Sequence, residues 1–137
     1  MIERYSIPEM SAIWSPDSRF SRWLEIEILA VEARAEAGLV PASDLKKIKE
    51  NAGFSVKRIN EIEKTVRHDV IAFLTSVSET LGPESRHIHY GMTSSDILDT
   101  CLATQLRDSG RLIMEELQRL GEALKGLVLR TRGIACM

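Results

Sequence analysis

The feature that most constrains the fold is one apolar stripe that runs through residues 95–131 without a proline. Its members recur every three or four residues, which is the repeat of one face of an α-helix. They are Leu98, Leu102, Leu106, Ser109, Ile113, Leu117, Leu120, Leu124 and Val128. At about 1.5 Å per residue, roughly 35 residues span on the order of 50 Å, more than the diameter of a compact domain of this size. We therefore expect one long helix in a bundle shared between subunits.

A kink at Ser109-Gly110 is the alternative, because it would fold the stripe into a helical hairpin inside a small bundle. The preceding residues also predict helices, separated by capping and breaking residues. These are Ser15-Pro16, Gly38, Pro41, Gly53, Ser55, Asp69 and Gly82-Pro83. No β-alternation or internal repeat appears, so the expected fold class is all-α. We divide the chain into a helical amino-terminal domain, residues 1–92, and the start of a central helical-bundle domain, residues 93–137.

Composition excludes several classes of function. Of the 137 residues 44% are hydrophobic and 28% charged, as in a soluble globular protein. The net charge of -2 suggests neither nucleic acid nor an anionic membrane as partner. No apolar run approaches the roughly 18 residues of a membrane helix, and the start MIERYSIPEM lacks the features of a secretory signal, so we expect a cytoplasmic protein. Cys101 and Cys136 have no metal-type spacing and are expected to be free thiols.

Two short polar clusters fall at expected helix boundaries. Arg4-Tyr5, in what we expect to be an extended arm, could hold a phosphate with a guanidinium and a phenol hydroxyl, although for the pair taken alone a solvated arm is the better explanation. Arg67-His68-Asp69 precedes a helix, where Asp69 could merely cap it. The trio could also support acid and base chemistry, since histidine exchanges a proton near neutral pH and arginine holds anions.

A third cluster, residues 86–96 (RHIHYGMTSSD), lies directly before the long helix. Its three hydroxyl residues and its aspartate supply more groups than one helix cap needs. With Gly91 and the free helix amides, they form a suitable cradle for a carboxylate. His87 and His89 could alternatively suggest a metal, but no further ligands stand at zinc-like spacing, so no metal is expected.

Four segments together resemble one family. They are MIERYSIPEMSAIW, RFSRWLEIEILAVEARAEAG, EIEKTVRHDVIAF and HYGMTSSDILDT. In this order and with these intervals the chain resembles the adenylosuccinate lyases of the fumarase and aspartase superfamily. HYGMTSSD alone indicates only the superfamily, whereas ERY and RHDV narrow the resemblance to this member.

The resemblance implies β-elimination of fumarate from adenylosuccinate, giving AMP, and from the succinyl-carboxamide ribotide of purine synthesis, without metal or cofactor. The residues that it assigns to substrate binding are Arg4, Tyr5, Arg67, His68, Asp69, His89, Thr93 and Ser94. Among these, His68 has a supporting catalytic role. Arg4 and Tyr5 are expected to contact the nucleotide phosphate. Thr93 and Ser94 are expected to hold the succinyl portion, and Ser95 and Asp96 to start the long helix.

The resemblance also implies a homotetramer whose active sites are each built from three subunits. The family's catalytic acid, a histidine, and its base, a serine on a mobile loop, belong to segments that this chain does not contain. We therefore expect a catalytically incomplete fragment. Its exposed stripe should cause self-association, for example into a non-native dimer, or the helix should fray at its far end.

Two alternatives remain open. One is another lyase of the superfamily, either argininosuccinate lyase or the carboxymuconate cycloisomerase; Arg4-Tyr5 discriminates, because only a nucleotide substrate needs a phosphate holder. The other is a non-catalytic helical interaction module, in which the polar clusters are caps and the stripe is a partner-binding face.

Overall fold

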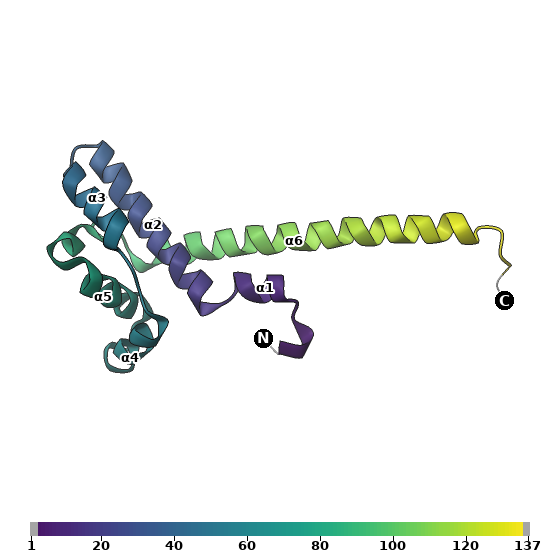
Figure 1. Cartoon of the computed structure of the whole chain (residues 1–137), viewed down its shortest axis with the longest axis horizontal. Coiled ribbons are helices and arrows are strands. Elements are labelled where there is room, and N and C mark those ends of the chain that lie inside the picture. The colour runs from purple at the N-terminus through teal and green to yellow at the C-terminus, as the bar shows by residue number, and fades with distance from the viewer. Residues whose placement is uncertain (1–2, 136–137) are drawn as a thin grey trace.

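A computed structural model describes residues 3–135, and every regular element in this range is helical (Figure 1). In chain order the elements are η1 Glu3–Tyr5, α1 Pro8–Ile13, α2 Pro16–Glu36, α3 Ala42–Asn51, α4 Val56–Val66, α5 Asp69–Leu81, η2 Gly82–His87 and α6 Ser94–Thr131. Helices α2 to α5 gather at one end of the molecule, and α6 projects from them as a long rod. The all-α prediction is confirmed. The division at residue 92 stays a prediction, and Cys136 lies outside the described residues.

Local capping explains where the predicted helices begin. Ser15 Oγ accepts a hydrogen bond from Ser18 N at 3.1 Å, with Pro16 at the first helical position of α2. Ser55 Oγ accepts from Arg58 N at 3.4 Å at the start of α4. The expected extended arm was wrong: residues 3–13 form η1 and α1 instead. Helix α1 has no side-chain cap and starts on a proline alone, so its start signal is weak.

An aromatic cluster between α2 and α5 forms the centre of the core. Phe20 and Phe73 stack with ring centroids 5.9 Å apart, and Trp23 meets Phe73 edge to face at 5.4 Å. All three side chains are almost completely buried. Phe54, in the segment before α4, packs beside them at 6.0 Å from Phe20. This cluster holds α2 in a fixed position relative to α5.

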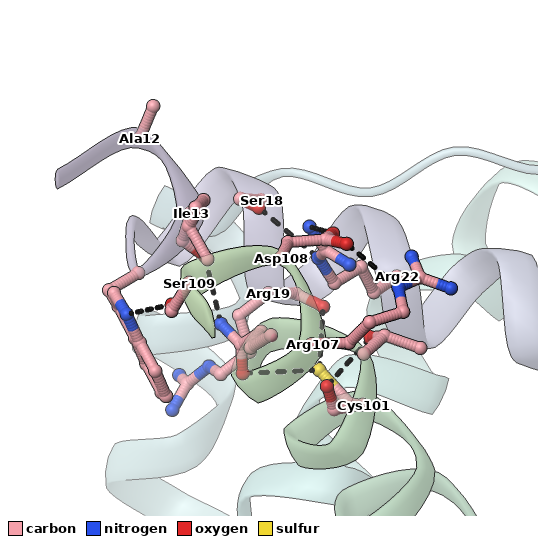
Figure 2. A network of polar contacts seen from close by, with 12 residues as sticks. Ala12, Ile13, Ser18, Arg19, Arg22, Cys101, Arg107, Asp108 and Ser109 are labelled. Atoms are coloured by element: carbon pink, nitrogen blue, oxygen red, sulfur yellow. Dashed lines mark hydrogen bonds and ion pairs between the residues drawn. The ribbon is translucent and has the colours of Figure 1, made fainter. Parts of the chain in front are cut away.

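The first turns of α6 pack on α1 and α2 through a seam that combines apolar packing with several polar contacts (Figure 2). Its buried members, four residues apart, are Ile97, Cys101, Gln105 and Ser109. Trp14 Nε1 donates to Ser109 Oγ at 3.0 Å, and Gln105 Nε2 donates to the Ile13 carbonyl at 2.9 Å. Arg22 and Asp108 form an ion pair at 2.8 Å beside the seam. We call the four buried residues of α6, together with their partners Trp14 and Ile13, the polar seam.

Beyond Ser109, none of the described residues of α6 is buried. The helix continues unbroken through Ser109-Gly110, so the kinked alternative was wrong. It starts at Ser94, one residue earlier than expected. Its 38 residues span about 57 Å. The exposed apolar side chains include Ile113, Leu117, Leu120, Leu124 and Val128; we call them the exposed stripe. Within residues 3–135, no helix is both long and apolar enough to span a membrane.

The ion pairs at Asp108 predict a pH dependence of stability. Hydrogen bonds from Arg107 and Arg22 lower the pKa of Asp108 from 3.8 to about 2. A depressed carboxyl pKa contributes stability that is fully present above pH 3.8 and is lost as the pH falls through about 2. We expect Asp108→Asn to be less stable than the unmodified chain at pH 7 in urea unfolding, and this difference to shrink towards zero near pH 2. Asp99→Asn, on the exposed face of the same helix, is the control; a difference for Asp108→Asn that is undiminished at pH 2 would contradict the prediction.

Candidate functional site

The loop of residues 88–93 connects η2 to α6 by a tight turn with unusual backbone angles. His89 has φ 59° and Gly91 has φ 78°, both in the left-handed region. Met92 N donates to the His89 carbonyl at 3.3 Å, which closes the turn. Glycine adopts such angles freely, whereas histidine needs contacts that hold it there.

Glu27 of α2 supplies those contacts, and its side chain is completely buried. Its Oε2 accepts a hydrogen bond from the His89 backbone N at 2.7 Å, and its Oε1 lies 2.7 Å from His89 Nδ1. Glu27 is not among the site residues predicted from the sequence. The available signal was its spacing: it lies four residues after Trp23 and four before Val31, at a core position where an apolar residue is expected.

Arg34 holds the same loop two helical turns further along α2. Its Nη1 donates to the His87 carbonyl at 3.2 Å, and its guanidinium lies 4.3 Å from the centre of the Tyr90 ring. A spacing of seven residues places Glu27 and Arg34 on one face of the helix. The loop is therefore fixed to α2 both before and after His89.

His87 has a structural partner. Its Nε2 lies 3.0 Å from Asp44 Oδ2, and Arg86 Nη2 pairs with the same oxygen at 2.7 Å. The hydrogen bond from His87, together with Ser43 and Arg86, lowers the pKa of Asp44 below its usual value. Throughout the part of the chain that the structure describes, no group of three or more His, Cys, Asp or Glu residues is arranged to hold a metal ion.

Residues 93–95 surround the start of α6. Thr93 is the N-cap residue, and Asp96 Oδ2 accepts a hydrogen bond from Thr93 N at 2.8 Å. The expectation that Ser95 and Asp96 start the helix was wrong by one residue, because Thr93 already takes the extended cap conformation. The hydroxyl groups thus lie beside the first amides of a long helix, where the helix dipole favours an anion.

Arg67-His68-Asp69 forms the junction between α4 and α5. Arg67 takes a left-handed conformation, φ 51°, as the C-cap residue that follows α4. The alternative in which Asp69 caps the helix does not hold, because His68 is the N-cap, with Nδ1 accepting from Ile71 N at 3.3 Å. An Nδ1 that accepts carries no hydrogen, so a neutral His68 ring has its hydrogen on Nε2. Its imidazole is half exposed.

Arg4 and Tyr5 lie at the amino-terminal end, with the guanidinium 4.8 Å from the centre of the tyrosine ring. Both are exposed. Among residues 3–135, no hydrogen bond or ion pair that the structure identifies joins Arg4-Tyr5, residues 67–69 and the 88–93 loop to one another. Within the described residues the three clusters are therefore separate in their polar contacts.

Comparison with known proteins gives consistent matches. A family model described as a lyase matches residues 3–134. The adenylosuccinate lyase of Bacillus subtilis (strain 168) is 52% identical over 125 residues, which is 91% of this chain and 29% of that protein. The adenylosuccinate lyase of Staphylococcus saprophyticus is 50% identical over 124 residues, 90% of this chain and 29% of that protein. The chain thus spans 29% of the length of these curated relatives.

Solved structures are similar as well. A fumarate lyase from Mesorhizobium sp. BNC1 has a TM-score of 0.80 at 25% identity, over 88% of this chain and 29% of that one. A 3-carboxy-cis,cis-muconate lactonizing enzyme from Pseudomonas putida has a TM-score of 0.82 at 29% identity, over 92% and 30%.

Gly91 provides a test of the loop geometry. A Cβ added at Gly91 meets nothing within 4 Å, so the strain of Gly91→Ala comes only from its φ of 78°. We expect a loss of about 1–2 kcal/mol in the free energy of unfolding. Gly110→Ala is the matched control, because it also meets nothing but lies inside α6. Gly110→Ala should raise the free energy of unfolding by about 0.5–1 kcal/mol. Equal effects of the two substitutions in urea unfolding would count against the strained turn.

Proposed function

The chain belongs to the lyase family whose model matches residues 3–134, and on this basis we propose that it is the amino-terminal part of an adenylosuccinate lyase. The observation that carries the proposal is the identity of about half to two adenylosuccinate lyases over some nine tenths of the chain. The proposed reaction is β-elimination of fumarate from adenylosuccinate, and from the related succinyl-carboxamide ribotide. In this reaction a general base removes a proton from the carbon beside a carboxylate, and a general acid protonates the departing nitrogen. No metal or cofactor is proposed.

The proposed substrate carries a phosphate at one end and succinyl carboxylates at the other, and the polar clusters offer groups that bind such anions. Arg4 and Tyr5, exposed side by side, are proposed to bind the nucleotide phosphate. Thr93 and Ser94 are proposed to hold a succinyl carboxylate at the amino-terminal end of α6.

The junction of α4 and α5 is proposed to line the same site through Arg67 and Asp69, with His68 in a supporting catalytic role. His68 Nε2–H is suited to donate a hydrogen bond to the substrate while Nδ1 caps the helix. His89, fixed by Glu27, belongs to the binding site as well.

The lack of polar contacts between the clusters agrees with a site that is completed by other subunits. The exposed stripe of α6 supplies the means, because apolar residues on one helix face bury themselves in a bundle with other copies. We propose a homotetramer with α6 in its central bundle. The principal acid and base are proposed to lie in the part of the relatives' length that this chain does not cover.

The proposal is tested by fumarate release from adenylosuccinate, followed by ultraviolet absorbance. We expect no release from the 137-residue chain alone. We expect release from a chimera in which this chain replaces the matching residues of the Bacillus subtilis enzyme. An inactive chimera that still assembles would overturn the proposal. So would a chimera that acts only on argininosuccinate or on carboxymuconate, and that outcome would support the other superfamily lyases.

Within the chimera, Ser94→Ala should lower kcat/KM by about 10-fold or more, because it removes a hydrogen bond to a charged group. Thr100→Ala is the control: it also removes a hydroxyl group from α6, its side chain is exposed, and it lies outside the 86–96 cluster. Its kcat/KM should be nearly unchanged.

The exposed stripe predicts self-association of the isolated chain. By size-exclusion chromatography with light scattering, we expect at least twice the monomer mass, falling to the monomer mass in Leu117→Glu/Leu124→Glu. Both leucines are about half exposed, so a charge on each opposes burial without disturbing the core. Gln118→Glu adds a charge outside the stripe and should leave the mass unchanged. A monomeric unmodified chain at high concentration would contradict this prediction.

A further inference from the structure

We propose that Glu27 is a positioning residue: it holds His89 with its hydrogen on Nδ1 and so leaves Nε2 as the nitrogen that meets the substrate. This inference rests on the proposed function, in which His89 belongs to the substrate site. Glu27 does not reach the substrate itself, because its side chain is completely buried.

The partners of His89 favour one tautomer of its ring. The backbone N of His89 can only donate, so Glu27 Oε2 accepts that bond. Oε1 lies 2.7 Å from Nδ1, the length of a charge-assisted hydrogen bond. An ionised carboxylate has only acceptors, so Nδ1 carries the hydrogen and Nε2 of the neutral ring has the lone pair.

The burial of Glu27 points to a role beyond stability. Taking a carboxylate out of water costs more than burying an apolar side chain of similar size, and two short hydrogen bonds offset that cost only in part. Trp23 and Val31, one turn away on either side, are apolar core residues, so the position would accept an apolar residue. What an apolar residue could not supply is the orientation of His89.

The surrounding contacts keep the ring in place. The left-handed backbone of His89 is held at its N–H by Glu27, while Arg34 fixes the loop through the His87 carbonyl and Tyr90. The imidazole keeps 20% of its surface exposed, so it remains accessible. His68 has the opposite arrangement, with Nδ1 accepting from a backbone amide. As neutral rings the two histidines thus present complementary groups, an acceptor at His89 Nε2 and a donor at His68 Nε2.

The first test is nitrogen NMR of the unmodified chain with labelled histidine. The chain has three histidines, and His89→Gln assigns the signals of one. At the high-pH limit, where the rings are neutral, we expect His89 in the Nδ1–H form and His68 in the Nε2–H form. A neutral His89 with its hydrogen on Nε2 would overturn the inference, because Glu27 would then be donating a proton rather than accepting one. This measurement needs no variant of Glu27.

The second test uses Glu27→Gln, which keeps an oxygen at only one of the two positions that accept these bonds and puts an NH₂ donor at the other. If this oxygen takes the backbone N–H, the amide NH₂ faces Nδ1, and the ring should shift to the Nε2–H form. Glu25→Gln makes the same change on the exposed side of α2 and should leave the spectrum unchanged. A folded Glu27→Gln variant with an unchanged His89 tautomer and an unchanged backbone amide signal would refute the positioning role.

Kinetics in the chimera test the consequence for the reaction. We expect Glu27→Gln to lower kcat/KM by about 10-fold or more, as for other residues that orient a ligand-binding histidine. Because Glu27 acts through His89, the double variant with His89→Gln should be no worse than His89→Gln alone. Additive losses would overturn the inference. An unmodified chimera without lyase activity would instead reject the proposed function, and the tautomer of His89 would still decide whether Glu27 orients the ring.

Discussion

Helix α2 packs against both α5 and the first turns of α6, and through these two contacts it positions two of the three polar clusters. On one side α2 contributes Phe20 and Trp23 to the aromatic core, which holds α5 and thereby its start at His68. Beside the polar seam, Arg22 binds Asp108 of α6. A further face carries Glu27, which fixes the loop that leads into α6. One helix therefore sets the relation between two of the three polar clusters.

Helix α6 uses two different surfaces: the polar seam contacts the rest of the chain, and the exposed stripe does not. Within the chain the helix is held by directional hydrogen bonds from Gln105 and to Ser109, in contact with α1. Its leucines are left almost entirely outside this contact; Leu102 and Leu106, one position after buried Cys101 and Gln105, are already about half exposed. The domain thus uses little of the apolar surface of α6, and that surface remains for the bundle.

Much of the fold could be predicted because its signals are local. Ser15 and Ser55 cap helices within three residues of themselves, and an uninterrupted apolar stripe is enough to predict a single long helix. The site was predictable only as separate clusters. The contact of Glu27 with His89 joins residues 62 positions apart, and helical periodicity gives no register between two distant elements.

Other features could not be predicted because two neighbouring residues, or two neighbouring faces of a helix, were equally suited to the same position. Capping preferences favour aspartate, so they did not predict that His68 rather than Asp69 would cap α5. Likewise the periodicity placed the leucines of α6 on one face, but it did not reveal that the neighbouring face, with Cys101 and Gln105, is the one covered by the chain.

Because α6 is unsupported beyond the polar seam, a small change of its angle at the seam, which acts as a pivot, moves its far end by a large distance. From Ser109, the last buried residue of the described helix, to Thr131 the distance is about 33 Å. A tilt of about 10° at the pivot displaces the far end by roughly 6 Å, more than one helical turn. Hydrogen bonds depend on angle far more strongly than leucine contacts do. The few bonds made by Trp14, Gln105 and Asp108 thus set the direction of α6. They therefore also set how accurately the far end of the exposed stripe can meet another helix.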